Sequence, residues 1–398
     1  MSASSTETQD VAGARMLVLG RRPEVMETVL DELNELGIAA HGSTDPDNAP
    51  AAYDASAFDL IALGGGLSGA PGRRLKAQFT RQHPEAQFLD TFAPRAVHEI
   101  VAALSGASQT PQVDLDAYCA RIGYDGPREP TLATLHALQA LHPAAIPFEA
   151  VDVLLDRGID LSPTAVDAKL IGAGRGGYCF EHNGLLKRVL TAMGFHVEGL
   201  LARVRWLAPA GTSPGPRTHM ALRVTVDDVP WLVDVGFGAC VPTAPLRMDT
   251  TSPQPTQHET FRVIPFGHDI MVQARVNDRW RPMYQLSPEA QLDEDYEPAN
   301  WYTSQHPSSH FRDTLMVART TPTARFTLQQ GKFTMRRPDG RVERAILDAD
   351  GIEDVLHETF GLPVERGWRA VIEGAAAAQA RSAATTTVSE GRSVGATE

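Results

Sequence analysis

The sequence predicts a protein of the α/β and α+β classes, with a small parallel sheet first and a larger helix-then-sheet domain after it. Up to about Ser105, apolar strand patterns alternate with helical patterns, which is typical of a doubly wound parallel sheet. From Asp114 the apolar spacing is helical. From Gly199 onward the apolar residues alternate with a period of two, which indicates antiparallel strands.

Composition excludes several classes of protein. The chain has 398 residues, of which 42% are hydrophobic and 21% charged, so we expect more than one soluble domain. The net charge of −13 disfavours nucleic acid and anionic membranes as partners. No apolar run is long enough to span a bilayer, and "MSASSTETQD" lacks the features of a secretory signal. Three scattered cysteines favour a reducing cytoplasm over a disulfide framework.

The first domain is expected over 14–105, after a disordered stretch at 1–13. Its apolar runs and helical patterns alternate and are bounded by glycine or proline. Strands are predicted over 14–20, 38–44, 58–66 and 86–93, and helices over 23–37, 72–84 and 94–106. The stretch 106–113, "GASQTPQV", is typical of a linker.

This order of strands and helices resembles the receiver domain of response regulators, without its functional residues. Receivers carry paired acidic residues after the first strand, where this chain has Arg21 and Arg22. They carry a phosphorylatable aspartate at the end of the third strand, where this chain has Gly64. We therefore expect a degenerate receiver-like module for docking or homodimer formation. The alternative is a phosphate-binding turn at Gly64 to Gly72, which lacks the Gly-Lys-Ser/Thr of a phosphate loop.

Cys179 lies in "RGGYCFEHN", where a glycine-rich loop is followed by a helical pattern. The reactive form of cysteine is the thiolate, and a helix N-terminus stabilises the thiolate of such a residue. The position therefore suits a nucleophile. The alternative is a buried structural cysteine, because free cysteine is among the most buried residue types.

A base and a group that orients it are found further along, in "RTHMALRVTVDDVPWLVDVGFG". His219 begins one predicted strand, Asp234 lies on the next, and "DDVP" is typical of a hairpin turn. A tight turn would leave the two residues offset, so a twist or bulge would have to bring them together. A carboxylate in an apolar strand needs a partner if it is buried, but a surface-facing position is the alternative.

The chain order Cys179, His219, Asp234, with helices first and strands second, is that of papain-like folds. The ordered motifs "RGGYCFEHNGLL", "THMALRV", "LVDVGFG" and "NWYTSQHPSSHF" go further and resemble the arylamine N-acetyltransferases over about 114–364. The resemblance implies a helical subdomain over 114–198, a β-barrel over 199–310 and an α/β lid over 311–374. The tail over 375–398 is poor in large apolar residues and is predicted to be disordered.

The resemblance also implies the roles of site residues. Cys179 would accept the acyl group, His219 would be its base and Asp234 would orient the base. Three aromatic residues would line the acceptor pocket, although ordinary aromatic core is the alternative: Phe148, Phe237 and Phe311. Three positions would contact coenzyme A, although Trp206 could equally belong to the barrel core: Trp206, Thr218 and Gly238. Arg175 and Glu149 would form a buried pair, with a solvated arginine as the alternative, and Ala150 replaces the family's usual asparagine.

The implied activity is acetyl transfer from acetyl-CoA, through a Cys179 thioester, to arylamine, hydrazine or arylhydroxylamine acceptors. No metal is expected. An amide synthase of the same fold, which would close a macrolactam or amide in secondary metabolism, is the alternative. A cysteine protease or transglutaminase would share the triad order, but the sequence lacks "C-G-S-C-W" and a downstream catalytic asparagine.

Overall fold

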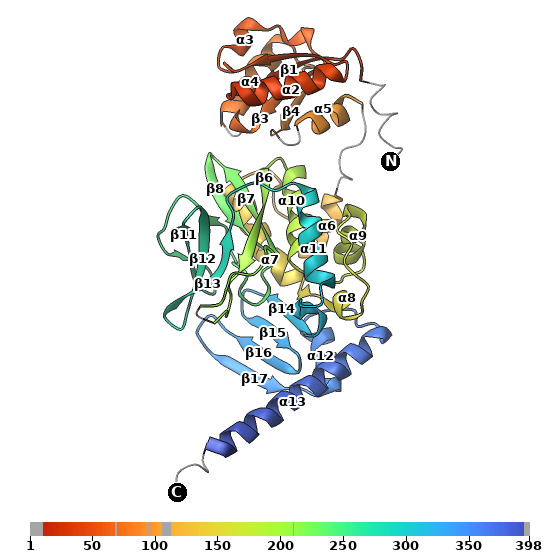
Figure 1. Cartoon of the computed structure of the whole chain (residues 1–398), viewed down its shortest axis with the longest axis vertical. Coiled ribbons are helices and arrows are strands. Elements are labelled where there is room, and N and C mark those ends of the chain that lie inside the picture. Colours follow the sequence, from red (N-terminus) through yellow and green to blue (C-terminus); the bar gives the residue numbers. More distant parts are fainter. Residues whose placement is uncertain are drawn as a thin grey trace. The chain divides into compact units, whose positions relative to one another are not determined.

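The computed structural model describes residues 11–67, 70–91, 93, 96–105, 113–209 and 211–393. The chain divides into two compact units, Met1–Gln112 and Val113–Glu398, which are described separately (Figure 1). Most of the stretch predicted to be disordered at 1–13, nearly all of the predicted linker and the last five residues lie outside the described residues.

The first unit is built on a four-stranded parallel sheet in the order β2-β1-β3-β4. Its strands are β1 (Arg15–Leu19), β2 (Ala39–Ser43), β3 (Leu60–Gly64) and β4 (Phe88–Thr91). Its helices are α2 (Pro23–Glu35), α3 (Ala49–Ala52), α4 (Ala70–Gln82) and α5 (Ala96–Leu104). Alternate strand residues point to opposite faces, so Met16 and Val18 pack with α2 and α5, whereas Leu17 and Leu19 pack with α3 and α4.

The carboxyl end of this sheet carries the two positions at which the sequence was compared with receiver domains. Arg21 follows β1 and forms an exposed ion pair with Asp47, and Gly64 is the last residue of β3. Asp59 precedes β3, at the other end of the sheet, and accepts a hydrogen bond of 2.8 Å from the backbone N–H of Arg15. Asp59 is therefore held beside Arg15, at the end of the sheet opposite to Gly64.

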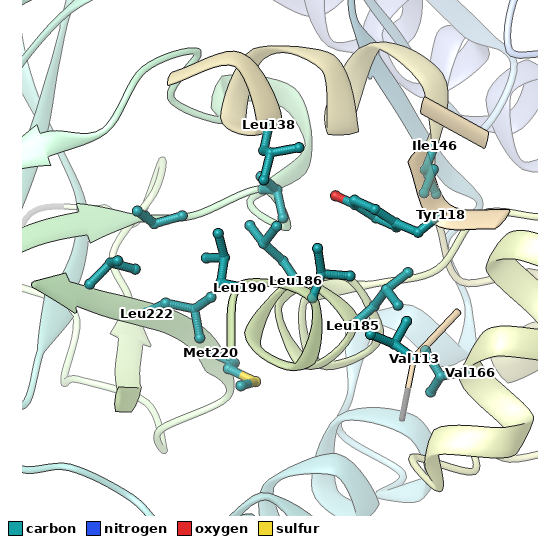
Figure 2. Close-up of a cluster of buried hydrophobic side chains, with 14 of the residues drawn as sticks. Val113, Tyr118, Leu138, Ile146, Val166, Leu185, Leu186, Leu190, Met220 and Leu222 are labelled. Carbon is teal, nitrogen blue, oxygen red and sulfur yellow. The ribbon is translucent and has the colours of Figure 1, made fainter. Parts of the chain in front are cut away.

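The second unit begins with a group of helices around α10. These are α6 (Leu115–Ile122), α7 (Leu132–Ala145), α8 (Val151–Leu154), α9 (Pro163–Asp167), the π-helical turn η4 (Ala168–Gly172) and α10 (Cys179–Ala192). The side chains of Asp114 and Thr131 cap the first two helices. Figure 2 shows Leu185, Leu186 and Leu190 of α10 among the other buried side chains of this core: Val113, Tyr118, Leu138, Ile146, Val166, Met220 and Leu222.

An antiparallel sheet of eight strands follows, in the order β10-β11-β12-β13-β6-β7-β8-β9. The strands are β6 (His196–Val204), β7 (His219–Val226), β8 (Val229–Val233), β9 (Leu246–Arg247), β10 (Gln254–Pro255), β11 (Thr260–Phe266), β12 (Asp269–Val276) and β13 (Arg279–Leu286). The two edge strands meet through one side chain: Gln254 accepts from the backbone N–H of Arg247 at 2.7 Å and donates to its carbonyl at 3.0 Å. A side chain thus joins the sheet's ends where a closed barrel would have a backbone ladder.

A third sheet has five strands, in the order β17-β16-β15-β14-β5. It contains β14 (Met316–Thr320), β15 (Arg325–Gln329), β16 (Lys332–Arg336), β17 (Val342–Ile346) and β5 (Phe148–Glu149). Strand β5 comes from the helical segment and pairs with β14, so it joins the sheet formed by the strands of the expected lid. In the chain, helix α11 (Tyr296–Gln305) follows the second sheet and helix α12 (Ala349–Glu358) follows the last strand of the third sheet.

The prediction of a disordered tail is wrong for the residues up to Ser393. They belong to a single helix, α13 (Arg369–Ser393), drawn in dark blue in Figure 1. The prediction weighed the lack of large apolar residues, but alanine has the highest helix propensity, and the tail begins "AAAQA". Ile372 and Ala375 are buried beside Trp368 and α12, which anchors the start of the helix. Among the described residues, no helix has the length and apolar character needed to cross a membrane.

Candidate active site

Cys179 is the first residue of α10, as the glycine-rich loop predicts. The side chain of Glu181 accepts a hydrogen bond of 3.0 Å from the backbone N–H of Tyr178, which fixes the start of the helix. Glu181 is buried and paired with Lys169 at 2.7 Å. The Cys179 thiol lies 3.6 Å from the carbonyl oxygen of Thr218, so the sulfur faces the beginning of β7.

Two glycines permit this close packing. A Cβ atom on Gly176 would collide with the carbonyl oxygen of Pro147, so the loop before the cysteine has no space for a side chain. A Cβ atom on Gly236 would lie 2.7 Å from the Cα of Cys179. The segment that follows β8 therefore lies directly against the nucleophile because it carries a glycine at this point.

His219 and Asp234 are brought together by the hairpin of β7 and β8. His219 Nε2 lies 2.8 Å from Asp234 Oδ2, and both side chains are buried. The turn consists of Asp227 and Asp228, with φ angles of 50° and 62°, as two-residue hairpins with positive φ require. The β7–β8 ladder runs from Val226↔Val229 to Leu222↔Val233 without a register shift. Of the two expected ways to close the offset, a twist or a bulge, the ladder contains no bulge, and Asp234, the first residue after β8, reaches His219 diagonally.

The second carboxylate oxygen of Asp234 is also occupied. Its Oδ1 accepts hydrogen bonds from Asn183 Nδ2 at 3.1 Å and from the backbone N–H of Gly236 at 2.9 Å. Burial acts to raise the pKa of Asp234, but the charge of His219 and these hydrogen bonds outweigh it and lower the pKa. Asp234 is therefore an ionised, fully partnered carboxylate, which excludes the alternative of a surface-facing position.

The environment of His219 favours its protonated form. Burial opposes the charge, but Asp234 and then Cys179 outweigh burial and raise the pKa of His219 to about 10. Because Nε2 is bound to Asp234, Nδ1 is the nitrogen left for Cys179. The arrangement supplies a thiol, an imidazolium and an orienting carboxylate, which is the equipment of nucleophilic catalysis.

Two residues that the sequence analysis missed complete this group. Asn183 also donates to the Met220 carbonyl at 2.7 Å, and its Oδ1 accepts from the backbone N–H of Val235 at 3.1 Å. It lies four residues after Cys179, so helical spacing could have placed it on the same face. The ring of Tyr284 lies 4.8 Å from that of His219, and its buried hydroxyl has no hydrogen-bond partner among the described residues.

The structure brings the expected pocket and coenzyme residues close to the triad. The rings of Phe148 and Phe311 lie 6.2 Å apart, and that of Phe237 lies 5.1 Å from His219. Trp206 contacts Phe237 at 6.2 Å. A Cβ atom on Gly238 would lie 3.4 Å from the Phe148 ring, and a small apolar hollow between these two residues extends to Val235 and Ala318.

A buried ionic group holds the loop before Cys179. Arg175 donates through Nη2 and Nε to Glu149 at 2.8 Å and 3.0 Å, and through Nη2 to Asp152 at 3.1 Å. Its guanidinium also lies over the ring of Trp368 at 4.6 Å. The other oxygen of Glu149 accepts from the backbone N–H of Val151 at 2.7 Å. Glu149 thereby binds a backbone group next to Ala150, where the side chain of the usual asparagine is missing.

A chain of buried histidines lies behind the pocket. His182 Nε2 contacts the Pro147 carbonyl at 3.2 Å, so this nitrogen is the donor and Nδ1 the acceptor. His142 Nε2 then donates to His182 at 2.9 Å, and the Tyr118 hydroxyl donates to His142 Nδ1 at 2.9 Å. Burial lowers the pKa of His182 to about 4 and that of His142 well below its usual value. Both rings are neutral, and His182 stacks on Phe148.

The other two cysteines belong to the hydrophobic cores. Burial raises the pKa of Cys240 to about 12 and also raises that of Cys119. Both cysteines are therefore small core residues and not reactive thiols. The described residues contain no group of three or more histidine, cysteine, aspartate or glutamate side chains placed to hold a metal ion.

The fold and the site first define the class of protein. A helical domain presents a cysteine at a helix start, and a sheet presents the histidine and the aspartate, as in papain-like cysteine acyltransferases. The family model described as N-acetyltransferase matches residues 131–369. The arylamine N-acetyltransferase of Mycobacterium tuberculosis is 42% identical over 263 residues, which are 64% of this chain and 93% of that protein. The chain belongs to the arylamine N-acetyltransferase family.

Two further comparisons agree. The arylamine N-acetyltransferase / N-hydroxyarylamine O-acetyltransferase of Salmonella typhimurium is 40% identical and is matched over 89% of its length by 63% of this chain. The structure of the Mycobacterium marinum arylamine N-acetyltransferase in complex with CoA is 39% identical, with a TM-score of 0.63 over 66% of this chain and 98% of that chain. The family match begins at residue 131 and does not include the first unit.

Proposed function

We propose that this protein transfers the acetyl group of acetyl-CoA to arylamine, hydrazine or arylhydroxylamine acceptors by a ping-pong reaction. The observation that carries the proposal is the arrangement of Cys179, His219 and Asp234 at a helix start beside three aromatic rings. The relatives are named for arylamine acetylation, and one solved relative binds CoA, which supports the choice of acceptor and donor.

In the first half-reaction, the Cys179 thiolate attacks the thioester carbonyl of acetyl-CoA. A bond forms between that carbon and Cys179 sulfur, and the bond from the carbon to the CoA sulfur breaks. The imidazolium of His219 gives its proton to the departing CoA sulfur and becomes neutral. The hydrogen bonds of Asp234 keep the ring in place, so its free nitrogen stays directed at the reacting atoms.

In the second half-reaction, the neutral amine attacks the acetyl-cysteine. The new carbon–nitrogen bond replaces the carbon–sulfur bond, the amine proton passes to His219, and the thiolate–imidazolium pair is restored. The tetrahedral intermediates carry a negative oxygen, for which the backbone N–H of Cys179 at the helix start is a suitable donor. The aromatic pocket would exclude water, which otherwise hydrolyses the acetyl-enzyme.

The supporting roles follow from position. Phe148, Phe237 and Phe311 would contact the aromatic acceptor. Three residues would contact coenzyme A: Trp206, Thr218 and Gly238. The carbonyl oxygen of Thr218 lies 3.6 Å from the Cys179 sulfur and Trp206 contacts Phe237, which supports the proposal that both contact a molecule bound at Cys179.

For the first unit we propose a receiver-like fold that serves self-association rather than phosphorylation. Its parallel order 2-1-3-4 supports the likeness, and Gly64 and Arg21 support the loss of the phosphate-acceptor site. The nucleotide-binding alternative falls partly on Ser68 and Gly69, which lie outside the described residues. A cytoplasmic location stays a prediction from the sparse cysteines.

The proposal is tested by mass spectrometry of the protein after incubation with acetyl-CoA. One acetyl group is expected on Cys179, and Cys179→Ser should lose nearly all transfer to 4-substituted anilines while it stays folded. Cys240→Ala serves as the matched control and should keep the acetylation. An acetyl group on Cys119 or Cys240, or full activity of the serine variant, would contradict the assignment. Acylation only by a carrier-bound chain would instead favour an amide synthase.

A further inference from the structure

The first unit carries opposite charges on its two faces. Helix α2 has a stripe of exposed acidic residues and no lysine or arginine: Glu24, Glu27, Asp31 and Glu35. Helix α4 has exposed arginines and no acidic residue: Arg73, Arg74 and Arg81. At about 100° per residue, each set falls within about 100° of arc, opposite the side of the helix that faces the core. None of these seven side chains forms an ion pair within the described residues.

The two stripes face away from each other. The buried residues of α2 pack with Met16 and Val18 on one side of the sheet, whereas those of α4 pack with Leu17 and Leu19 on the other. The stripes of one molecule therefore cannot meet, because the sheet lies between them. A contact between them requires a second molecule.

At one end of each helix the charges also oppose the helix dipole, whereas Glu24 in the first turn of α2 and Arg81 in the last turn of α4 agree with it. The last turn of α2, where the backbone carbonyls are unpaired, contains Glu32 and Glu35 and no basic residue. The start of α4, where the N–H groups are unpaired, has no acidic residue in its first turn and is followed by Arg73 and Arg74. Each arrangement is unfavourable for an isolated helix. If α2 and α4 of two molecules lie antiparallel, both unfavourable helix ends are compensated, since Arg73 and Arg74 then lie beside the acidic end of α2.

We propose that α2 of one molecule binds α4 of a second molecule of this chain, in an antiparallel, head-to-tail contact. The proposal deepens the self-association suggested above and is independent of acetyl transfer. Both helices have 13 residues, about 20 Å in length, so the basic stripe over 73–81 fits within the length of the acidic stripe over 24–35. Because the two surfaces lie on opposite faces, the contact is heterologous and extends to a chain or ring instead of a two-fold dimer. A contact of two helices is small and charged, so the association is weak and sensitive to salt.

The test is sedimentation velocity of the full chain at about 10 and about 300 µM, in about 50 mM and about 500 mM NaCl. At low salt the weight-average mass should rise more than twofold with concentration, and at high salt it should return to that of the monomer. Monomer under all conditions would overturn the proposal. A plateau at the dimer would support self-association but overturn the head-to-tail contact, as would assembly that is insensitive to salt.

Charge reversal identifies the surfaces. E27K/D31K/E35K and R73E/R74E/R81E should each be monomeric, since each makes both faces alike in charge. Their equimolar mixture, and the variant that combines all six substitutions, should associate again. E35K, R73E and R74E agree with the helix dipoles, whereas R81E replaces the favourable basic residue in the last turn of α4, so circular dichroism checks that both variants fold. The control is R279E/R281E/R344E, which changes exposed arginines of the second unit and should associate as the wild type does. Association of either single-face variant alone would overturn the proposal.

Discussion

His219, the first residue of β7, and Asp234, the first residue after β8, meet diagonally at the open end of their hairpin, with side chains 2.8 Å apart. The Asp227–Asp228 turn fixes the register of the two strands, and the register fixes the diagonal. Asn183 and Gly236 then hold the oxygen of Asp234 that does not bind His219. The orientation of the catalytic base is therefore set by a local hairpin, and one helix residue connects this hairpin to the nucleophile.

Asp234→Asn is expected to lower the pKa of His219 well below its wild-type value of about 10, because burial is then opposed by Cys179 alone. The stability that His219 contributes is complete below pH 6.5 and is lost as pH rises towards 10, so the variant should lose this alkaline dependence. Nitrogen-15 NMR of the imidazole measures the pKa directly. An unchanged titration would mean that Asp234 is not the partner that sets the charge of His219.

The buried histidine chain predicts acid sensitivity. His182 has a pKa of about 4 in the folded protein and 6.5 as its ordinary value, so the unfolded chain binds the proton more readily. Stability should therefore fall as pH drops from 6.5 towards 4, and His142 adds to the effect in the same direction. Thermal unfolding of the wild type and of His182→Gln across this range measures it.

The glutamine variant should be less stable at pH 7.5 but should show a flatter pH dependence. The control is His357→Gln, an exposed residue of α12, which should leave the pH dependence unchanged. Equal slopes for the wild type and His182→Gln would show that the histidine chain does not set acid stability.

Arg175→Ala is expected to destabilise the protein by about 3–5 kcal/mol, because it leaves Glu149 buried without its cation. Arg175→Lys should recover only part of this, since lysine cannot bind Glu149 and Asp152 with the geometry of guanidinium. Arg157→Ala is a matched control: Arg157 is half-exposed and contacts Asp152 and Glu365 at 3.4 Å and 3.2 Å. Its loss should cost about 1 kcal/mol or less in urea unfolding. Similar costs for the two alanine variants would contradict the buried-pair argument.

What the sequence could predict depended on how local the signal was. The position of Cys179 follows from a loop and a helix that adjoin it, and the strand that carries His219 follows from its own alternation. Tyr284 could not be found, because it reaches His219 from a strand more than sixty residues later and nothing in "RWRPMYQL" marks it. The joining of the sheet edges by Gln254 has no pattern either, since it depends on one side chain replacing a ladder.

Two expectations depended on local effects. A twist or a bulge was expected to close the offset between His219 and Asp234, and the β7–β8 ladder has no bulge, so the two side chains reach each other diagonally. The tail was expected to be disordered because apolar content was weighed and helix propensity was not.

The last prediction concerns the division of labour between the two units. A chain that starts at Pro111 should fold and keep its acetylation rate with small arylamines within a few-fold of full length. It retains Val113, which is buried in the core around α10, together with every residue of the proposed site. Stopped-flow measurement of the acetylation rate with both chains tests this, and sedimentation shows the loss of the α2–α4 contact in the shorter one. A folded truncation without activity would mean that the first unit contributes to the active site.

Acetyl phosphate should leave the full-length rate unchanged, because Gly64 stands where an acceptor aspartate is needed, Asp59 is bound to Arg15 and Asp90 to Lys76. A clear response to acetyl phosphate would show that one of these two aspartates is phosphorylated after all, and Asp59→Asn and Asp90→Asn would identify which.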